Sequence, residues 1–199
     1  MVKARLANFY KLLKKHRRYV ILGFIAAILL LFFTAQIKTF IVLSILGVVA
    51  TFSTFYKRVF QAPPAFELIT LTVVAVSIFY GPGVGSLYAV VISISSEVAS
   101  QALDPFSITY IFPRIVTAFV APWLYGQGSG PLHNVAMLGL AMSLLYNALQ
   151  QPVYWFLTDP EKRIKALYFS ILNIPINWLV FKFLGGPLFD LLKVLVKPS

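Results

Sequence analysis

Cysteine is absent from this chain of 199 residues, and charged residues are scarce. The lack of thiols excludes disulfides, thiolate metal sites and cysteine nucleophiles. Only two histidines occur, His16 and His133, far apart in the sequence, so a histidine metal site has little support. Charged residues make up 12% of the chain, against about 25% in a typical soluble domain, whereas 59% of the residues are hydrophobic. This composition predicts a protein that is dissolved mostly in lipid.

Seven apolar stretches are each long enough to cross a bilayer, whose core of about 30 Å requires roughly 20 helical residues. They cover residues 19–36, 38–56, 64–80, 84–102, 108–126, 133–157 and 166–184. Glycine and proline mark breaks at 61–64, 81–85, 104–105, 126–131 and 185–187, and the polar run 158–165 separates the last two stretches. Because lipid cannot satisfy a bare backbone, such spans must be helices. The predicted fold class is all-α, a polytopic bundle of six or seven transmembrane helices in the cell membrane.

Three regions are expected along the chain. Residues 1–18 form a basic amphipathic juxtamembrane segment, residues 19–184 form the transmembrane helical bundle, and residues 185–199 form an interfacial C-terminal tail. The lysines and arginines of the first region favour a cytoplasmic N-terminus and contact with membrane lipids, and not with nucleic acid. No glycine or proline separates the first two stretches, so residues 19–56 either cross twice or bend and cross once.

The polar residues of each predicted core helix recur about every four residues and therefore share one face. In part this is packing, because small residues let helices approach closely, and we assign Gly85, Ala89, Ser93, Gly139 and Ser143 to that role. Glu97 and Arg114 each lie about nine residues from the turn near residue 105. In antiparallel neighbours they reach the same depth, which predicts an ion pair, either structural or part of a ligand site. The same arithmetic around residue 160 brings Asn147 level with Asn173.

The polar residues concentrate in the halves of the helices nearest one membrane side, which predicts a polar cup that opens on one face. Such a cup suits a small, partly polar organic ligand. The candidate ligand-binding residues are Glu67, Glu97, Tyr110, Arg114, Asn147, Gln150, Gln151, Tyr154, Asn173 and Asn177. We find no Ser-His-Asp set, no carboxylates paired at one site and no phosphate-binding glycine loop. We therefore expect no enzyme activity, no catalytic residues, no metal and no cofactor.

The order of four segments resembles a known family. An acidic helix start (Phe66–Thr70) precedes a glycine-rich turn (Tyr80–Ser86), then a helix with prolines (Tyr110–Pro122) and a final helix with Ile171–Asn177. This order is similar to that of the substrate-binding S components of energy-coupling-factor vitamin transporters, and membrane proteins of the MreD type share the architecture. The resemblance implies a six-helix core that binds a vitamin-like solute near the outer face. It also implies docking on a transmembrane coupling subunit driven by two ATPases.

In that family the coupling subunit is contacted by small residues spaced by three on the first core helix, which here are Ser44, Gly47, Ala50 and Ser53. The leading functional hypothesis is thus the substrate-binding membrane subunit of a micronutrient transporter. A non-enzymatic scaffold of the MreD type and a lipid-handling membrane protein are the alternatives. With seven spans, the positive-inside rule turns the cup toward the cytoplasm, opposite to the family, and the side it faces stays open.

Overall fold

A computed structural model describes residues 36–56, 66–101, 108–126, 130–157 and 160–196. The basic segment 1–18 and the predicted span 19–36, apart from its last residue, lie outside this range. The chain divides into two compact units, residues 1–42 and 43–199. The second unit carries the candidate ligand-binding residues, and the fold described below is that of this unit.

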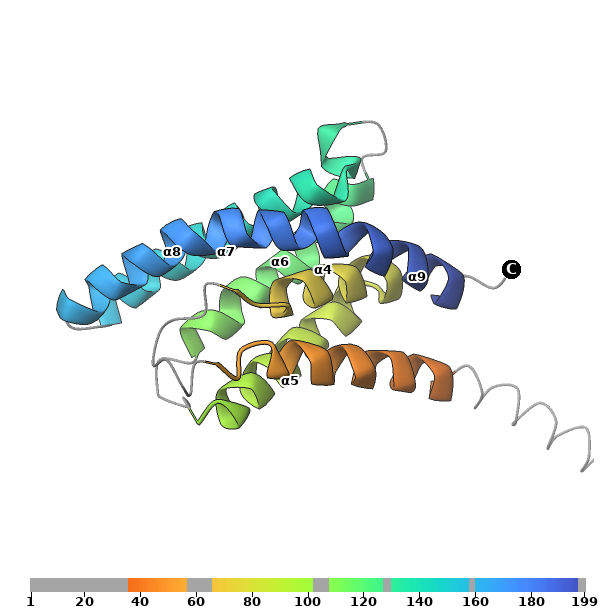
Figure 1. The fold of residues 1–199 in the computed structure, drawn as a ribbon, viewed down its shortest axis with the longest axis horizontal. Coiled ribbons are helices and arrows are strands. Elements are labelled where there is room, and N and C mark those ends of the chain that lie inside the picture. The colour runs from red at the N-terminus through yellow and green to blue at the C-terminus, as the bar shows by residue number, and fades with distance from the viewer. Residues whose placement is uncertain (1–35, 57–65, 102–107, 127–129, 158–159, 197–199) are drawn as a thin grey trace, which may run out of the picture. The chain divides into compact units, whose positions relative to one another are not determined.

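The described residues are mostly helical and contain no strand, which confirms the all-α class. A helix at Gln36–Phe52 begins in the first unit and ends in the second. The elements that follow are α4 (Ile69–Tyr80), α5 (Pro82–Ala99), α6 (Ile108–Gly126), the 3-10 helix η2 (Pro131–His133), α7 (Val135–Leu157), α8 (Pro160–Val180), the π-helix η3 (Phe181–Gly185) and α9 (Gly186–Val196) (Figure 1). Each helix from α4 to α8 packs against the next, and α6 also packs against α4.

The third predicted span is shorter than expected, because residues 66–68 are not part of α4. Their backbone is bound by side chains of the segment after helix Gln36–Phe52. The N–H of Leu68 donates to the hydroxyl of Ser53 at 3.0 Å. Tyr56 donates its hydroxyl to the carbonyl of Phe66 at 2.8 Å and accepts the N–H of Phe66 at 3.0 Å. These side-chain bonds take the place of helical backbone bonds in residues 66–68. The apolar pattern of the sequence does not indicate such bonds.

Two other predicted boundaries are wrong. Helix α8 begins at Pro160, so most of the predicted turn 158–165 is helical, and proline is well suited to a first helical position. The chain also stays helical through Gly185, Gly186 and Pro187. Gly186 has ordinary helical angles, φ −54° and ψ −59°. A proline inside an α-helix loses one hydrogen bond and clashes with the preceding turn. The wider π-helical turn directly before Pro187 provides room for it.

Helices α4 and α5 are joined by one residue. Gly81 has φ 94° and ψ 157°, and α5 begins directly after it at Pro82. Glycine reaches positive φ without steric cost, whereas other residues do so rarely. The predicted break at 81–85 is thus reduced to Gly81, and the other glycines of this run lie inside α5.

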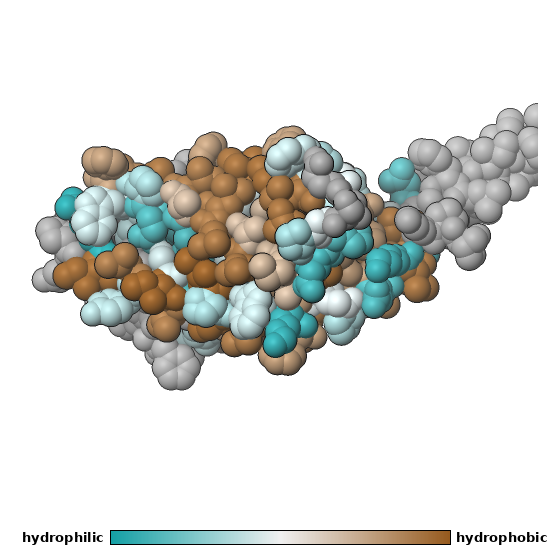
Figure 2. All heavy atoms as spheres, turned by 90° about the horizontal axis from the view of Figure 1, so that it is seen from above, coloured by the Kyte–Doolittle hydropathy of each residue, from teal (hydrophilic) through white to brown (hydrophobic). Residues whose placement is uncertain are grey.

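Large apolar side chains cover much of the outside of the described helices, while several charged and amide side chains are buried. Phe156 is 84% exposed, whereas Glu67 and Asn173 are fully buried. Exposed apolar side chains occur on the other long helices but not on α4, and they include Phe52, Leu87, Phe119, Trp123, Leu144, Tyr168, Phe183 and Val194. Figure 2 shows brown, apolar side chains over much of one face. This distribution is the reverse of that in a typical water-soluble protein.

Among the described helices, α5 is both long and apolar enough to cross a membrane, with 18 residues or about 27 Å. Helix Gln36–Phe52 and α4 are apolar but shorter. The later helices carry polar residues that the sequence analysis identified, such as Arg114 in α6 and Gln150 in α7.

Helix α9 occupies the region predicted as the C-terminal tail and is amphipathic. Phe189 is buried and meets Phe79 and Tyr125 edge to face, with ring centroids 5.5 Å and 5.6 Å apart. On the outer face Lys193 donates to Asp190 at 2.8 Å, and this bond raises the pKa of Lys193. The tail is therefore packed against α4 and α6 on one side.

We expect a small loss of stability when the bond between Thr54 and Ser96 is removed. The two buried hydroxyls lie 3.0 Å apart and join the end of helix Gln36–Phe52 to α5. Bonds of this kind between helices in a membrane contribute about 0.6 kcal/mol on average. Thr54→Val should therefore lower the free energy of unfolding in detergent by roughly that amount. Ser96→Ala should cost little more once Thr54→Val is present, and fully additive losses would contradict a direct bond.

Candidate functional site

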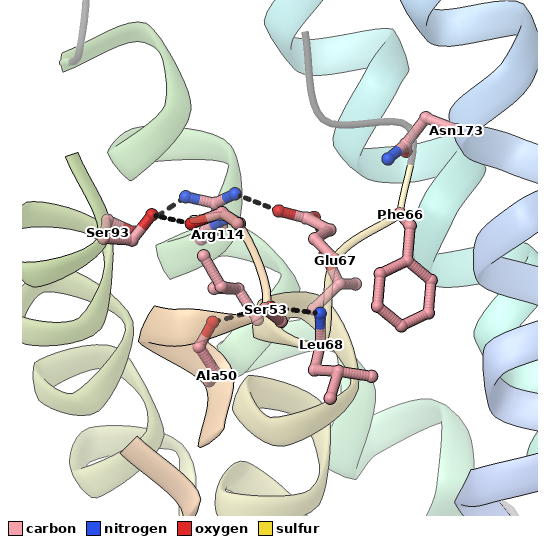
Figure 3. A network of polar contacts seen from close by, with 12 residues as sticks. Ala50, Ser53, Phe66, Glu67, Leu68, Ser93, Arg114 and Asn173 are labelled. Carbon is pink, nitrogen blue, oxygen red and sulfur yellow. Dashed lines mark hydrogen bonds and ion pairs between the residues drawn. The ribbon is translucent and has the colours of Figure 1, made fainter. Parts of the chain in front are cut away.

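Arg114 in α6 joins three helices through its side chain. It forms an ion pair with Glu67, with 2.5 Å between Nη2 and Oε2, and its Nη1 donates to the hydroxyl of Ser93 in α5 at 3.0 Å. Figure 3 shows the guanidinium between Ser93 and Glu67. The other carboxylate oxygen of Glu67 accepts the hydroxyl of Thr70 at 2.6 Å, in the first turn of α4. All of these side chains are buried, so the charges are shielded from solvent and paired within the protein.

The ion pair of Arg114 with Glu67 was not predicted, because Glu97 was expected to be the partner. Glu97 is buried in α5, one turn beyond Ser93, and its charge also acts on Arg114. The expected depth of Glu97 is therefore correct. The ring of Tyr146 from α7 lies against the same guanidinium, with its centroid 5.4 Å from Cζ. Arg114 thus contacts the segment directly before α4, helix α5 and helix α7.

A second polar group lies along the seam between α7 and α8. The amide of Asn147 donates to Oδ1 of Asn173 at 2.9 Å and to the carbonyl of Ser143 at 2.8 Å. One turn further along α7, the amide of Gln151 donates to the hydroxyl of Ser170. Asn173 and the charged group are drawn together in Figure 3. The predicted alignment of Asn147 with Asn173 is confirmed.

Several polar atoms of this seam are buried without a hydrogen-bond partner. They include five amide atoms, which are Oδ1 of Asn147, Oε1 of Gln150, Nδ2 of Asn173 and both Nδ2 and Oδ1 of Asn177. The hydroxyl of Ser143 is a further one. A buried polar atom without a partner costs about 1–3 kcal/mol, so most proteins leave few of them. We name these four amide residues the amide seam.

The chain matches no family model, and no curated protein or solved structure is significantly similar to it. The resemblance to S components and to MreD-type proteins therefore stays a prediction.

In the part of the chain that the structure describes, the candidate ligand-binding residues belong to a polar interior, and most of them are buried instead of lining an open cup. Glu67, Glu97, Arg114, Asn147, Gln150, Asn173 and Asn177 are all buried. Tyr110, Gln151 and Tyr154 are partly exposed, and the rings of Tyr110 and Tyr154 are 6.3 Å apart. The polar group is closed because the helices pack around it and its charges bond to one another.

Sequence reasoning missed three residues of this interior. Ser93 was interpreted as packing, although it bonds Arg114. Tyr146 lies next to Asn147 and was not considered, although it is almost fully buried against Arg114. Ser170 is not among the predicted ligand-binding residues, although its hydroxyl accepts the amide of Gln151. Ser93 lies one helical turn before Glu97 and therefore shares its face of α5. This spacing was the signal that could have identified Ser93 as a contact of Arg114 in α6.

The residues predicted to dock a coupling subunit are placed differently from one another. Ser44 is exposed and Ser53 is partly buried. Gly47 and Ala50 are buried within the chain, where a Cβ on Gly47 would lie 2.8 Å from Cδ1 of Ile92. Gly47 and Ala50 therefore serve the packing of helix Gln36–Phe52 on α5, and they offer little surface to a partner.

Proposed function

We propose that this protein is a multi-pass integral membrane protein that binds a small, uncharged polar solute at the amide seam. In this proposal it serves as the substrate-binding subunit of a transporter. The single observation that carries the proposal is the set of five unpartnered amide atoms inside a bundle whose outer surface is apolar. Three of these atoms are acceptors and two are donors.

The membrane location is supported by the distribution of side chains. Large apolar residues are exposed on all the long described helices except α4, and the buried residues include Glu67, Arg114 and Asn173. In lipid, an apolar exterior carries no penalty, and polar residues that face the bundle interior mark functional positions. The apolar length of α5 agrees with this interpretation.

The expected polarity of the solute follows from which polar groups of the interior already have a partner in the protein. Arg114 forms an ion pair with Glu67 and also interacts with the charge of Glu97, so its guanidinium is already engaged by the protein's own carboxylates. The amide seam offers both donors and acceptors, which suits a neutral solute with carbonyl and N–H groups. Such a solute would satisfy atoms that are otherwise costly to bury. The seam would have to open slightly to admit it, because its residues are closed to solvent.

A transporter subunit would require a partner that couples binding to energy. The resemblance noted in the sequence favours a transmembrane coupling subunit with ATPases. Ser44 is the exposed one among the predicted docking residues, and the neighbouring Ile45 and Val48 are exposed as well. Membrane lipids would surround the remaining surface.

Asn177 allows a sharp test, because neither of its amide atoms has a partner in the structure. We expect Asn177→Leu to leave the ligand-free protein as stable as before, or more stable, since an unsatisfied amide is removed. The same change should abolish solute binding. Gently purified wild-type protein, Asn177→Leu and the control Gln36→Ala would be compared by native mass spectrometry, with released small molecules identified and unfolding temperatures recorded.

The proposal predicts one stoichiometric solute in the wild type and in Gln36→Ala, whose side chain is exposed. It predicts none in Asn177→Leu. Wild-type protein that arrives empty but with another membrane protein attached would contradict solute binding and favour the scaffold. A solute retained by Asn177→Leu, and also by Asn147→Ala and Asn173→Ala, would place the binding site elsewhere.

A further inference from the structure

A groove of about 460 Å³ lies at the end of the bundle that contains the start of α7. Asn134 and Met137 line one wall, and Trp178, Lys182 and Gly186 line the other, with Phe181 between them. The groove therefore runs between α7 and the junction of α8, η3 and α9. It begins at Trp178, the residue after Asn177, but shares no residue with the amide seam.

The π-helical segment shapes this groove. Gly139 is so close to Phe181 that a Cβ would meet Cγ of its ring at 2.1 Å, and a Cβ on Gly185 would meet Cγ1 of Val135 at 2.5 Å. Helix α7 is therefore held tightly against η3 at these two glycines. Short π-helical segments inside α-helices occur often at functional sites. Here the segment carries Lys182, one of the residues that line the groove.

The groove combines a cation with aromatic and apolar walls. The ammonium of Lys182 lies 5.2 Å from the ring centroid of Trp178 and 5.7 Å from that of Phe183. No acidic residue is among those that line the groove. Met137 lines the groove and is exposed, and Phe183 and Leu184, which follow Lys182 in η3, are exposed apolar side chains as well. The stacked rings of Tyr125 and His133, with centroids 4.8 Å apart, belong to the same end of the bundle.

We propose that this groove binds an anionic phospholipid from the surrounding membrane. The headgroup phosphate would lie against Lys182, and one acyl chain would follow the apolar edge at Met137 and Phe183. Trp and Lys are the side chains that anchor proteins at the level of lipid headgroups. The charge of Lys182 complements the phosphate, and the exposed apolar edge fits an acyl chain, which a free anion lacks. This inference rests on the membrane location proposed above, and not on the solute site.

Trp178 provides a local signal, since the chain has three tryptophans and Trp123 and Trp155 are exposed. In the full chain with Trp123→Phe and Trp155→Phe, Trp178 is the single tryptophan. We would reconstitute this protein in vesicles of phosphatidylcholine with either brominated phosphatidylglycerol or brominated phosphatidylcholine as a minor component. Bromine quenches tryptophan on contact, so the ratio of the two quenching curves measures the preference of the groove for the anionic lipid.

We expect a preference of about five-fold for phosphatidylglycerol, as one lysine near a membrane surface contributes about 1 kcal/mol. Lys182→Gln should remove this preference, while Lys193→Gln, on the exposed face of α9, should retain it. Equal quenching by both lipids in the unchanged protein, or a preference that survives Lys182→Gln, would overturn the inference. Loss of the preference in millimolar inorganic phosphate would show that a free anion is the ligand and would also overturn it.

The result is separable from that of the solute experiment. If the protein carries no solute but shows the Lys182-dependent preference, the lipid site stands and the solute site fails. Asn177→Leu should leave the quenching ratio unchanged, because the two sites share no residue. No quenching by either brominated lipid would contradict the membrane location on which the lipid site rests.

Discussion

Arg114→Met should lower the free energy of unfolding by about 3–5 kcal/mol, the largest effect we expect from a single substitution in this chain. The guanidinium is the ion-pair partner of Glu67, whose side chain is fully buried. Methionine fills a similar volume but leaves the carboxylate without its cation, and the hydroxyl of Ser93 loses its donor. The measurement is equilibrium unfolding in detergent micelles, followed by circular dichroism as denaturant is added.

A second substitution separates the loss of the pair from the loss of packing. Glu67→Gln in the Arg114→Met background removes the uncompensated charge, so the double variant should be more stable than Arg114→Met alone. Lys193→Ala is the matched control, because its pair with Asp190 is exposed and such pairs contribute no more than about 1 kcal/mol. If Arg114→Met and Lys193→Ala had equal effects, the charged group would not be a structural centre of the bundle.

Gly85→Ala should destabilise the protein by about 1–3 kcal/mol, the second largest effect. Gly85 lies in α5 against Ser77 of α4, and a Cβ there would meet the Ser77 hydroxyl oxygen at 2.0 Å and its backbone Cα at 2.8 Å. A backbone atom cannot rotate away, so the two helices would have to separate. Thermal unfolding of the purified protein in detergent would measure the change.

Gly83→Ala is the matched control, two residues away in the same helix. A Cβ on Gly83 has no heavy atom within 4 Å. Alanine is favoured over glycine in a helix by up to about 1 kcal/mol, so this variant should be neutral or slightly more stable. Equal behaviour of the two variants would mean that α4 and α5 are not in close contact at Gly85.

Much of the helical order follows from the sequence because the apolar stretches and their breaks are local signals. The predicted span 108–126 coincides with α6, and 133–157 differs from α7 by two residues at its start. The alignment of Asn147 with Asn173 was also predictable, since a short turn fixes the register of two antiparallel helices. For two helices joined by a short turn, counting residues from the turn is sufficient to predict which side chains lie at the same level.

The partner of Arg114 was not predictable in that way, because Glu67 is 47 residues away and two helices intervene. Nor do hydrophobic patterns indicate that side chains of residues 53–56 bind the backbone of 66–68. The burial of the polar interior likewise depends on contacts between residues that are far apart in the sequence. Which polar groups satisfy one another depends on how four helices meet, and this is decided by packing over the whole bundle.

The single-residue connection at Gly81 has a consequence for biogenesis. Two helices joined by one residue cannot insert into a bilayer one after the other. The connection at Gly81 is too short for α4 to span the membrane while α5 is still outside it. In a membrane, α4 and α5 would therefore enter together as a helical hairpin, with the turn leading. The hairpin carries Glu67 and Glu97 near its trailing end, so neither carboxylate has to cross the apolar phase before Arg114 of the next helix arrives.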